Sequence, residues 1–309
     1  PPPVSFGRAG HVEQRRRLPY ADPRNSKSGP EVATMKKSIV WLASYPKSGN
    51  TWVRIFLANY LMNPDKPVPI NQVHRFGIGD SIAKTYRQVA GREIDYNDPN
   101  TVLPLRDRVL RGIVGNNADV NLVKTHNIRD TAFGVDLVPK KYTRSAIYIL
   151  RNPLDMVLSY ARHHGLTLEQ TVEAIGRNDN ATQGVGEAVI TFLGTWSEHV
   201  DSWTRPASYP QMVVRYEDLL EDPETHFAKI VEHLGVPVQQ ERLKRAIRFS
   251  SFEELSEQEK KSGFVEKSRQ ADRFFASGKS GQWREKLPQE LADKVMRDHE
   301  RVMKQYGYL

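Results

Sequence analysis

Residues 38–52 decide the fold of this chain and read Ser38-Ile39-Val40-Trp41-Leu42-Ala43-Ser44-Tyr45-Pro46-Lys47-Ser48-Gly49-Asn50-Thr51-Trp52. The apolar run at 38–43 predicts a buried strand, which a Tyr-Pro pair ends. Apolar residues at helical spacing from 52 to 61 predict a helix, and a small polar loop with Lys47 lies between the two. Strand, loop and helix in this order form an anion site, because the loop presents backbone N–H groups, the helix adds the positive end of its dipole and Lys47 adds a full charge.

The bulk composition indicates a polar surface and an anionic partner. The 309 residues have a mean hydropathy of −0.59 and a net charge of +8. No apolar run approaches the roughly 20 residues of a membrane helix, and no signal peptide is visible, so we expect no integral membrane segment. The absence of cysteine excludes disulfides and thiolate chemistry and favours a cytoplasmic location. Basic residues are dispersed among 37 acidic ones without an aromatic-basic repeat, which argues against nucleic acid as the partner.

The chain is predicted to consist of a tail and one domain. Residues 1–35 contain several prolines, the run Arg15-Arg16-Arg17 and few large apolar side chains. Such a segment buries too little surface to fold alone, so we expect it to be extended. Residues 36–309 are expected to form a single domain.

Short buried strands alternate with helices from residue 38 onward, which predicts an α/β fold of three layers. Strands are expected at 38–43, 120–124, 145–150 and 211–215, and an amphipathic core helix at about 184–204. Nearly continuous apolar strands between helices indicate a parallel sheet with helices on both faces. Ligands of such sheets bind beyond the carboxyl ends of the strands. The loops after Ala43, Lys124, Leu150 and Arg215 are therefore the places to look for chemistry.

Reactive side chains follow several of these strand ends. His126 comes after the second strand, where a neutral imidazole can take a proton from an alcohol at neutral pH. Arg151 ends the third strand, and Ser159 lies about two helical turns farther on. An arginine fork and a hydroxyl fit phosphate oxygens, although Arg151 could instead pair with Asp155 in a structural role. Acidic residues 217 and 218 after the fourth strand suit the first turn of a helix better than a paired-carboxylate site.

These segments, in their order, resemble the family of sulfotransferases that use 3′-phosphoadenosine 5′-phosphosulfate (PAPS). The opening loop is similar to the family's P-K-S-G-T-T-W, with Asn50 in place of the first threonine. Residues 124–126 resemble K-T-H, residues 151–160 resemble R-N-P-x-D-x-x-x-S-Y, residues 216–219 resemble Y-E-D-L, and residues 250–252 resemble T-S-F. Residues 276–283 resemble R-K-G-x-x-G-D-W, but Ala276 and Ser277 replace the basic pair and Gln282 replaces the acid. Lys279, Arg269 or Arg273 could supply the missing charge.

The resemblance implies a P-loop-like phosphosulfate-binding loop and a role for each matching residue. His126 would be the catalytic base, with Lys47 and Lys124 acting on the transferring group. Arg151 and Ser159 would bind the 3′-phosphate, and Tyr216 would lie along the nucleotide. The full set of implied nucleotide-binding residues is Lys47, Ser48, Gly49, Asn50, Thr51, Trp52, Arg151, Ser159, Tyr216, Ser250, Phe252, Ser277, Gly278 and Lys279.

The implied reaction is transfer of a sulfuryl group from PAPS to a hydroxyl, less often an amine, of a small-molecule or natural-product acceptor, which releases adenosine 3′,5′-bisphosphate. It requires no metal, and the histidines show no metal-ligand spacing. His163 and His164 are adjacent and diverge on a helix, so they are expected at the cleft edge or the surface, where one of them could contact the acceptor. The alternatives are an ATP-dependent small-molecule kinase, although the chain lacks G-K-[ST], and a non-catalytic anion or nucleic-acid binder. The acceptor and the oligomeric state stay open.

Overall fold

The computed structural model describes residues 37–184 and 187–309. Within them, a five-stranded parallel sheet has the strand order β2-β3-β1-β6-β9. Its strands are β1 (Ser38–Ser44), β2 (Ile78–Gly79), β3 (Val120–Thr125), β6 (Thr143–Leu150) and β9 (Gln211–Arg215). The four predicted strands are confirmed, and β2 is an edge strand that sequence patterning did not predict. Two short antiparallel pairs are β4 (Thr131–Ala132) with β5 (Val135–Asp136) and β7 (Ala181–Thr182) with β8 (Thr191–Phe192).

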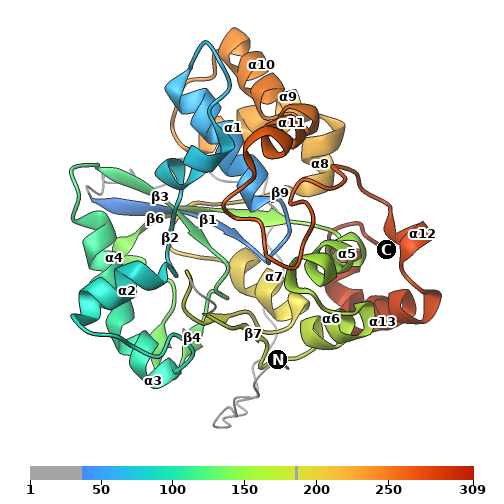
Figure 1. Cartoon of the computed structure of the whole chain (residues 1–309), viewed down its shortest axis with the longest axis horizontal. Coiled ribbons are helices and arrows are strands. Elements are labelled where there is room, and N and C mark those ends of the chain that lie inside the picture. The colour runs from blue at the N-terminus through green and yellow to red at the C-terminus, as the bar shows by residue number, and fades with distance from the viewer. Residues whose placement is uncertain (1–36, 185–186) are drawn as a thin grey trace.

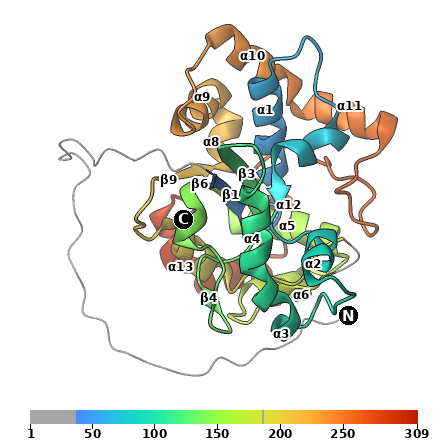
Figure 2. The same ribbon diagram turned by 90° about the vertical axis from the view of Figure 1, so that its left-hand side faces the viewer.

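Helices cover both faces of the sheet, so the predicted three-layer α/β architecture is confirmed (Figures 1 and 2). On one side lie α1 (Asn50–Met62), α8 (Tyr216–Glu221), α9 (Pro223–His233), α10 (Gln240–Phe249) and α11 (Phe252–Ser262). On the other lie α2 (Ala83–Ala90), α3 (Pro99–Val102), α4 (Arg106–Val114), α5 (Pro153–His164), α6 (Leu168–Ile175), α7 (Trp196–Thr204), α12 (Trp283–Lys286) and α13 (Gln289–Gln305). Single-turn or short 3₁₀ helices lie at η1 (Ile70–Phe76), η2 (Leu103–Leu105) and η3 (Lys140–Tyr142).

The central strands are buried on both faces, and their side chains alternate between two cores. Every residue of β1 is buried. Leu42 packs into the core beneath α1, α9 and α10, whereas its neighbours Trp41 and Ala43 pack into the core beneath α4, α5, α6 and α7. This period of two is the geometry of a strand covered on both faces. The arrangement leaves only the strand ends and the loops after them free to form a site.

Of the helix predicted over 184–204, the structure forms only the last nine residues as a helix; residues 185–186 of the predicted span lie outside the described residues. Helix α7 begins at Trp196, where Thr195 and Glu198 form a reciprocal capping box. Before it, the backbone is extended: Val189 N donates to Ser81 O, and Ile190 N donates to Tyr96 O. The apolar side chains of this segment nevertheless pack in the core as expected, whether their backbone is extended or helical: Val189, Phe192, Leu193, Trp196, Val200 and Trp203. A spacing compatible with a helix was thus overridden by pairing with distant backbone.

The predicted extended tail at 1–35 lies outside the described residues, and the single domain over 36–309 stays a prediction. Among residues 37–184 and 187–309, no helix is long and apolar enough to cross a membrane.

Candidate functional site

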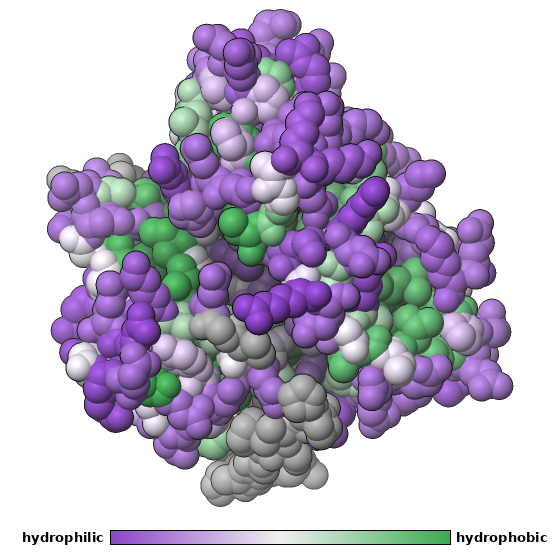
Figure 3. All heavy atoms as spheres, viewed as in Figure 1, coloured by the Kyte–Doolittle hydropathy of each residue, from purple (hydrophilic) through white to green (hydrophobic). Residues whose placement is uncertain are grey.

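A cavity of about 400 Å³ opens at the carboxyl ends of the central strands. It is lined from the predicted places: Lys47 after β1, Lys124 and His126 at the end of β3, Arg151 after β6 and Tyr216 after β9. The face of the molecule shown in Figure 1 is hollowed near its centre (Figure 3). Because all five strands are parallel, these ends meet at one edge of the sheet.

The loop between β1 and α1 is held in a conformation that few sequences can adopt. Gly49 has φ of 105°, and a Cβ atom there would lie 2.7 Å from the Tyr216 ring. Lys47 has φ of 68°, which is unusual for a residue with a side chain. Asn50 Nδ2 donates to Leu42 O at 2.8 Å and thereby ties the start of α1 back to β1. The first N–H groups of α1 have no partners within the helix and lie at the cavity wall that Gly49, Asn50 and Thr51 form.

His126 is held in the tautomer that a general base needs. Its Nδ1 lies 2.8 Å from the carbonyl oxygen of Ser44. A carbonyl only accepts, so Nδ1 carries the hydrogen and Nε2 carries the lone pair. Burial first, and then the charge of Lys124, place the pKa of His126 well below its ordinary value. The backbone of His126 is also held, since Nε2 of buried His199 lies 3.0 Å from its carbonyl oxygen. The imidazole is therefore neutral and fixed.

Among the described residues, the cationic side chains that line the cavity outnumber its carboxylates. Burial and the charges of Lys124, Arg162 and Arg151 lower the pKa of Lys47 to about 7. Arg151 Nη1 donates to the carbonyl oxygen of Lys47 at 3.0 Å, and its guanidinium stacks 4.4 Å from the centre of the Tyr216 ring. The Nε of Arg151 is buried and has no hydrogen-bond partner among the residues that the structure describes. A depressed lysine pKa and an unpaired guanidinium nitrogen both indicate a site shaped for a bound anion.

A loop after α11, residues 263–282, covers part of the cavity and is fastened by carboxylates. Asp155 accepts from Gly281 N at 2.6 Å and from Trp283 N at 3.0 Å, so it does not act as the partner of Arg151. Glu259 accepts from the backbone N–H groups of residues 274 and 275 at 2.7 and 2.9 Å. Gly278 has φ of 63°, and a Cβ there would meet the Phe252 ring at 2.5 Å. The loop thus sits directly on the residues that α11 presents.

Most of the sequence-predicted site residues line this one cavity. They are Lys47, Gly49, Asn50, Thr51, Trp52, Lys124, His126, Arg151, Ser159, Tyr216, Ser250, Phe252, Ser277 and Gly278. Ser48 is buried and its hydroxyl has no hydrogen-bond partner, but it does not line the cavity. Lys279, Arg269 and Arg273 are not among the lining residues, so the replacement for the missing basic pair stays a prediction. Residues 217 and 218 lie in the first turn of α8, as expected.

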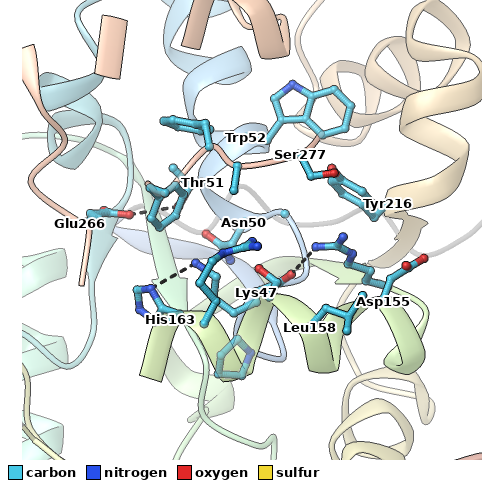
Figure 4. A pocket seen from close by; sticks show the side chains of 18 of the residues that line it. Lys47, Asn50, Thr51, Trp52, Asp155, Leu158, His163, Tyr216, Glu266 and Ser277 are labelled. Atoms are coloured by element: carbon cyan, nitrogen blue, oxygen red, sulfur yellow. Dashed lines mark hydrogen bonds between the residues drawn. The ribbon is translucent and has the colours of Figure 1, made fainter. Parts of the chain in front are cut away.

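Glu266 is a cavity residue that the sequence did not reveal. Its carboxylate accepts from Thr51 Oγ1 at 3.0 Å (Figure 4). It also forms an ion pair with Arg54 at 2.6 Å. Burial would raise its pKa, but Lys124, Arg54 and the hydrogen bonds outweigh burial and lower it. No signal could have found this contact, because Glu266 comes from an irregular loop 212 positions from Arg54.

Of the two expected places for His163 and His164, the cleft is confirmed and the surface is wrong. Both line the cavity, and burial lowers their pKa values to about 3 and about 4. Their rings lie 4.9 Å apart at right angles, so adjacent positions at the end of α5 still reach the same space. In the described residues, no group of three or more His, Cys, Asp or Glu side chains is arranged to hold a metal ion.

Comparison with known proteins gives one consistent match. A family model described as "Sulfotransferase domain" matches residues 37–307. Sulfotransferase 1 family member D1 of Mus musculus is 24% identical over 272 residues, which cover 85% of this chain and 83% of that protein. Cytosolic sulfotransferase 12 of Arabidopsis thaliana is 25% identical over 281 residues, covering 88% of this chain and 79% of that protein.

Solved structures show the same fold. Retinol dehydratase in complex with androsterone and inactive cofactor PAP superposes with a TM-score of 0.61 at 18% identity, covering 88% of this chain and 84% of that one. Mouse sulfotransferase SULT7A1 complexed with PAP gives a TM-score of 0.52 at 21% identity, covering 88% and 90%. The kinase and the non-catalytic binder are not favoured by these matches.

Proposed function

Because this chain belongs to the sulfotransferase family and is a PAPS-dependent enzyme that transfers a sulfuryl group to a hydroxyl, we propose that its cavity holds donor and acceptor together. Lys47, Ser48, Gly49, Asn50, Thr51 and Trp52 bind the 5′-phosphosulfate end, which lies at the start of α1. Arg151 and Ser159 bind the 3′-phosphate. Tyr216, Ser250 and Phe252 flank the nucleotide, and Ser277 and Gly278 cover it. Ser48 and Lys279 belong to this set as well, although neither is among the residues that line the cavity.

The residues present fit a multiply charged nucleotide. Burial and neighbouring cations depress the pKa of Lys47, and the Nε of Arg151 has no partner. A bound phosphate would raise the pKa of Lys47 through its negative charge and would offer acceptor oxygens to the Nε of Arg151. The glycine at position 49 lets the Tyr216 ring close on the loop, where a Cβ would collide with it. A flat ring beside a phosphate loop suits a nucleotide.

The single observation that carries the mechanism is the hydrogen bond from His126 Nδ1 to the carbonyl of Ser44. It leaves Nε2 free to take the proton from an acceptor hydroxyl as the oxygen–sulfur bond forms. The donor supplies the sulfuryl group and leaves as adenosine 3′,5′-bisphosphate when its sulfur–oxygen bond breaks. Lys47 stabilises the negative charge that grows on the departing phosphate, and Lys124 stabilises the charge on the transferring group.

The acceptor in this proposal is a small molecule with a hydroxyl, held on the side of the cavity that His126 faces. The acid–base and electrostatic work is assigned to His126, Lys47 and Lys124, so the reaction needs no metal. The lack of cysteine and the similarity to a cytosolic sulfotransferase of Arabidopsis support a cytoplasmic place of action.

Thermal unfolding with adenosine 3′,5′-bisphosphate in the presence of EDTA tests the donor site. We expect Tm to rise without a divalent cation, since ligand at a hundred times its Kd stabilises a protein by about 2.7 kcal/mol. Arg151→Met should reduce the rise, whereas Arg87→Met on the surface should not. A Tm that responds only to ATP with Mg²⁺ would refute the proposal.

His126→Ala tests the base. We expect the transfer rate to fall by a factor of about 10² to 10⁴, while the bisphosphate still raises Tm. Since burial keeps the pKa of His126 below 6.5, the base stays unprotonated at neutral pH, and the acidic limb of the wild-type kcat/KM profile should lie below pH 6.5. Full activity of the alanine variant with labelled PAPS would show that another group is the base.

A further inference from the structure

The side chain of Lys47 contacts a neutral side chain, that of His163, which lines the cavity but lies outside the phosphosulfate-loop motif. Its Nζ lies 3.3 Å from Nδ1 of His163, and Figure 4 shows this contact between the β1–α1 loop and α5. The same Nζ lies 3.9 Å from the centre of the Phe274 ring. An ammonium has hydrogens to donate and no lone pair, so Nδ1 of His163 is the acceptor when Lys47 is protonated. The ammonium is therefore held between an imidazole nitrogen and an aromatic face.

We propose that His163 is a positioning residue for Lys47: its neutral imidazole accepts a hydrogen bond from Nζ and, with the Phe274 ring, holds the ammonium beside the phosphosulfate loop. A lysine side chain has four rotatable bonds, and each fixed bond costs entropy. Fixing the ammonium before the donor arrives removes that cost from the binding step. The functional meaning of this inference rests on the proposed role of Lys47 toward the donor.

The chemistry of the partner explains why an imidazole suits this position. A carboxylate at 3.3 Å would position the lysine but would offset its charge. A neutral imidazole positions it and leaves the full charge for an anionic ligand. Burial, Lys47, His164 and Lys124 lower the pKa of His163 to about 3, so the ring stays neutral at physiological pH. An arriving phosphate can then take over the ammonium, since a charged acceptor binds it more strongly.

Other charged groups also shift the pKa of Lys47, and a test of the His163 contact has to be compared with their effects. Lys124 on β3, Arg151 after β6 and Arg162 on α5 lower its pKa, burial lowers it further, and Glu266 in the 263–282 loop opposes them. His164 also faces it from α5 and is uncharged at neutral pH. The pKa of Lys47 therefore lies at about 7, where the loss of one acceptor is readily measured.

Two substitutions separate the acceptor atom from the ring. His163→Phe keeps a ring and removes the acceptor, whereas His163→Asn removes the ring and keeps an oxygen near the place of Nδ1. The pKa of Lys47 is measured in the ligand-free protein from the pH dependence of its acylation, read on the Lys47 peptide by mass spectrometry. We expect His163→Phe to lower it by about one unit, a tenfold change in the protonation equilibrium. His163→Asn should stay near wild type, as should His74→Asn at an exposed position on η1.

A wild-type pKa of Lys47 in His163→Phe would overturn the proposal. An equal decrease in the Phe and Asn variants would also overturn it, because the acceptor atom would then make no difference. His163→Leu replaces the Phe variant if that protein does not fold. The measurement uses neither donor nor acceptor, so it is independent of the Tm shift with adenosine 3′,5′-bisphosphate. A His163-dependent pKa in a protein that fails to bind the bisphosphate would support the contact and refute the donor site.

Discussion

Breaking the ion pair between Arg54 and Glu266 by removing one partner should strongly destabilise the loop over the cavity. The Arg54 side chain is 1% exposed and that of Glu266 is 25% exposed, with 2.6 Å between Nη2 and Oε2. Glu266→Leu leaves the guanidinium buried without its counter-ion. Removing one partner of a buried pair costs about 3 to 5 kcal/mol, and the partial exposure of Glu266 places the expected loss near the lower end. For a chain of this size, we expect Tm to fall by about 6 °C.

The assay is thermal and urea unfolding at pH 7.5, with two comparisons. The double variant Arg54→Met/Glu266→Leu removes both charges and should recover part of the lost stability, because the guanidinium is no longer left unpaired while Lys124 still loses a nearby carboxylate. Glu93→Leu removes one partner of a surface pair whose side chains are 47% and 77% exposed, and should change stability by less than about 1 kcal/mol. A Tm of Glu266→Leu within a degree of wild type would refute this reasoning, as would a double variant no more stable than the single one.

The same pair has a defined pH dependence. Lys124, Arg54 and hydrogen bonds hold the pKa of Glu266 below its ordinary value of 4.5 against the effect of burial. A carboxylate whose pKa is lower in the folded state stabilises the fold above the unfolded-state pKa and loses this effect as the pH falls. The stability difference between wild type and Glu266→Leu should therefore be constant above about pH 5.5 and shrink below pH 4.5. A difference that grows on acidification would contradict the assignment.

Two further predictions concern the same loop. Asp155→Asn weakens the acceptor for the N–H groups of Gly281 and Trp283, so amide hydrogen exchange at both positions should accelerate by at least tenfold; unchanged exchange would exclude this fastening. Gly278→Ala places a methyl group 2.5 Å from the Phe252 ring at φ of 63°, so the Kd for adenosine 3′,5′-bisphosphate should rise at least tenfold in calorimetry, and an unchanged Kd would show that the loop does not cover the nucleotide.

The sequence by itself determined the strand–loop–helix unit and the layered fold. These features depend on neighbours in the chain: β1 is a continuous apolar run, and a glycine at position 49 with a helical apolar pattern after it marks the start of α1. The direction of the strands then predicted which loops would meet, since parallel strands end at one edge. For this reason Lys47, His126 and Arg151 could be expected in one place before any contact was known.

Only the tertiary structure decided which side chains complete the site. Lys47 and His163 are 116 positions apart, and Arg54 and Glu266 are 212 apart. No periodic pattern joins such residues, because their approach depends on how separate loops pack over the strand ends. The extended segment before α7 failed as a predicted helix for the same reason, since its backbone pairs with residues near 81 and 96 rather than with itself. Local spacing decides what a segment is able to form, and distant partners decide what it does form.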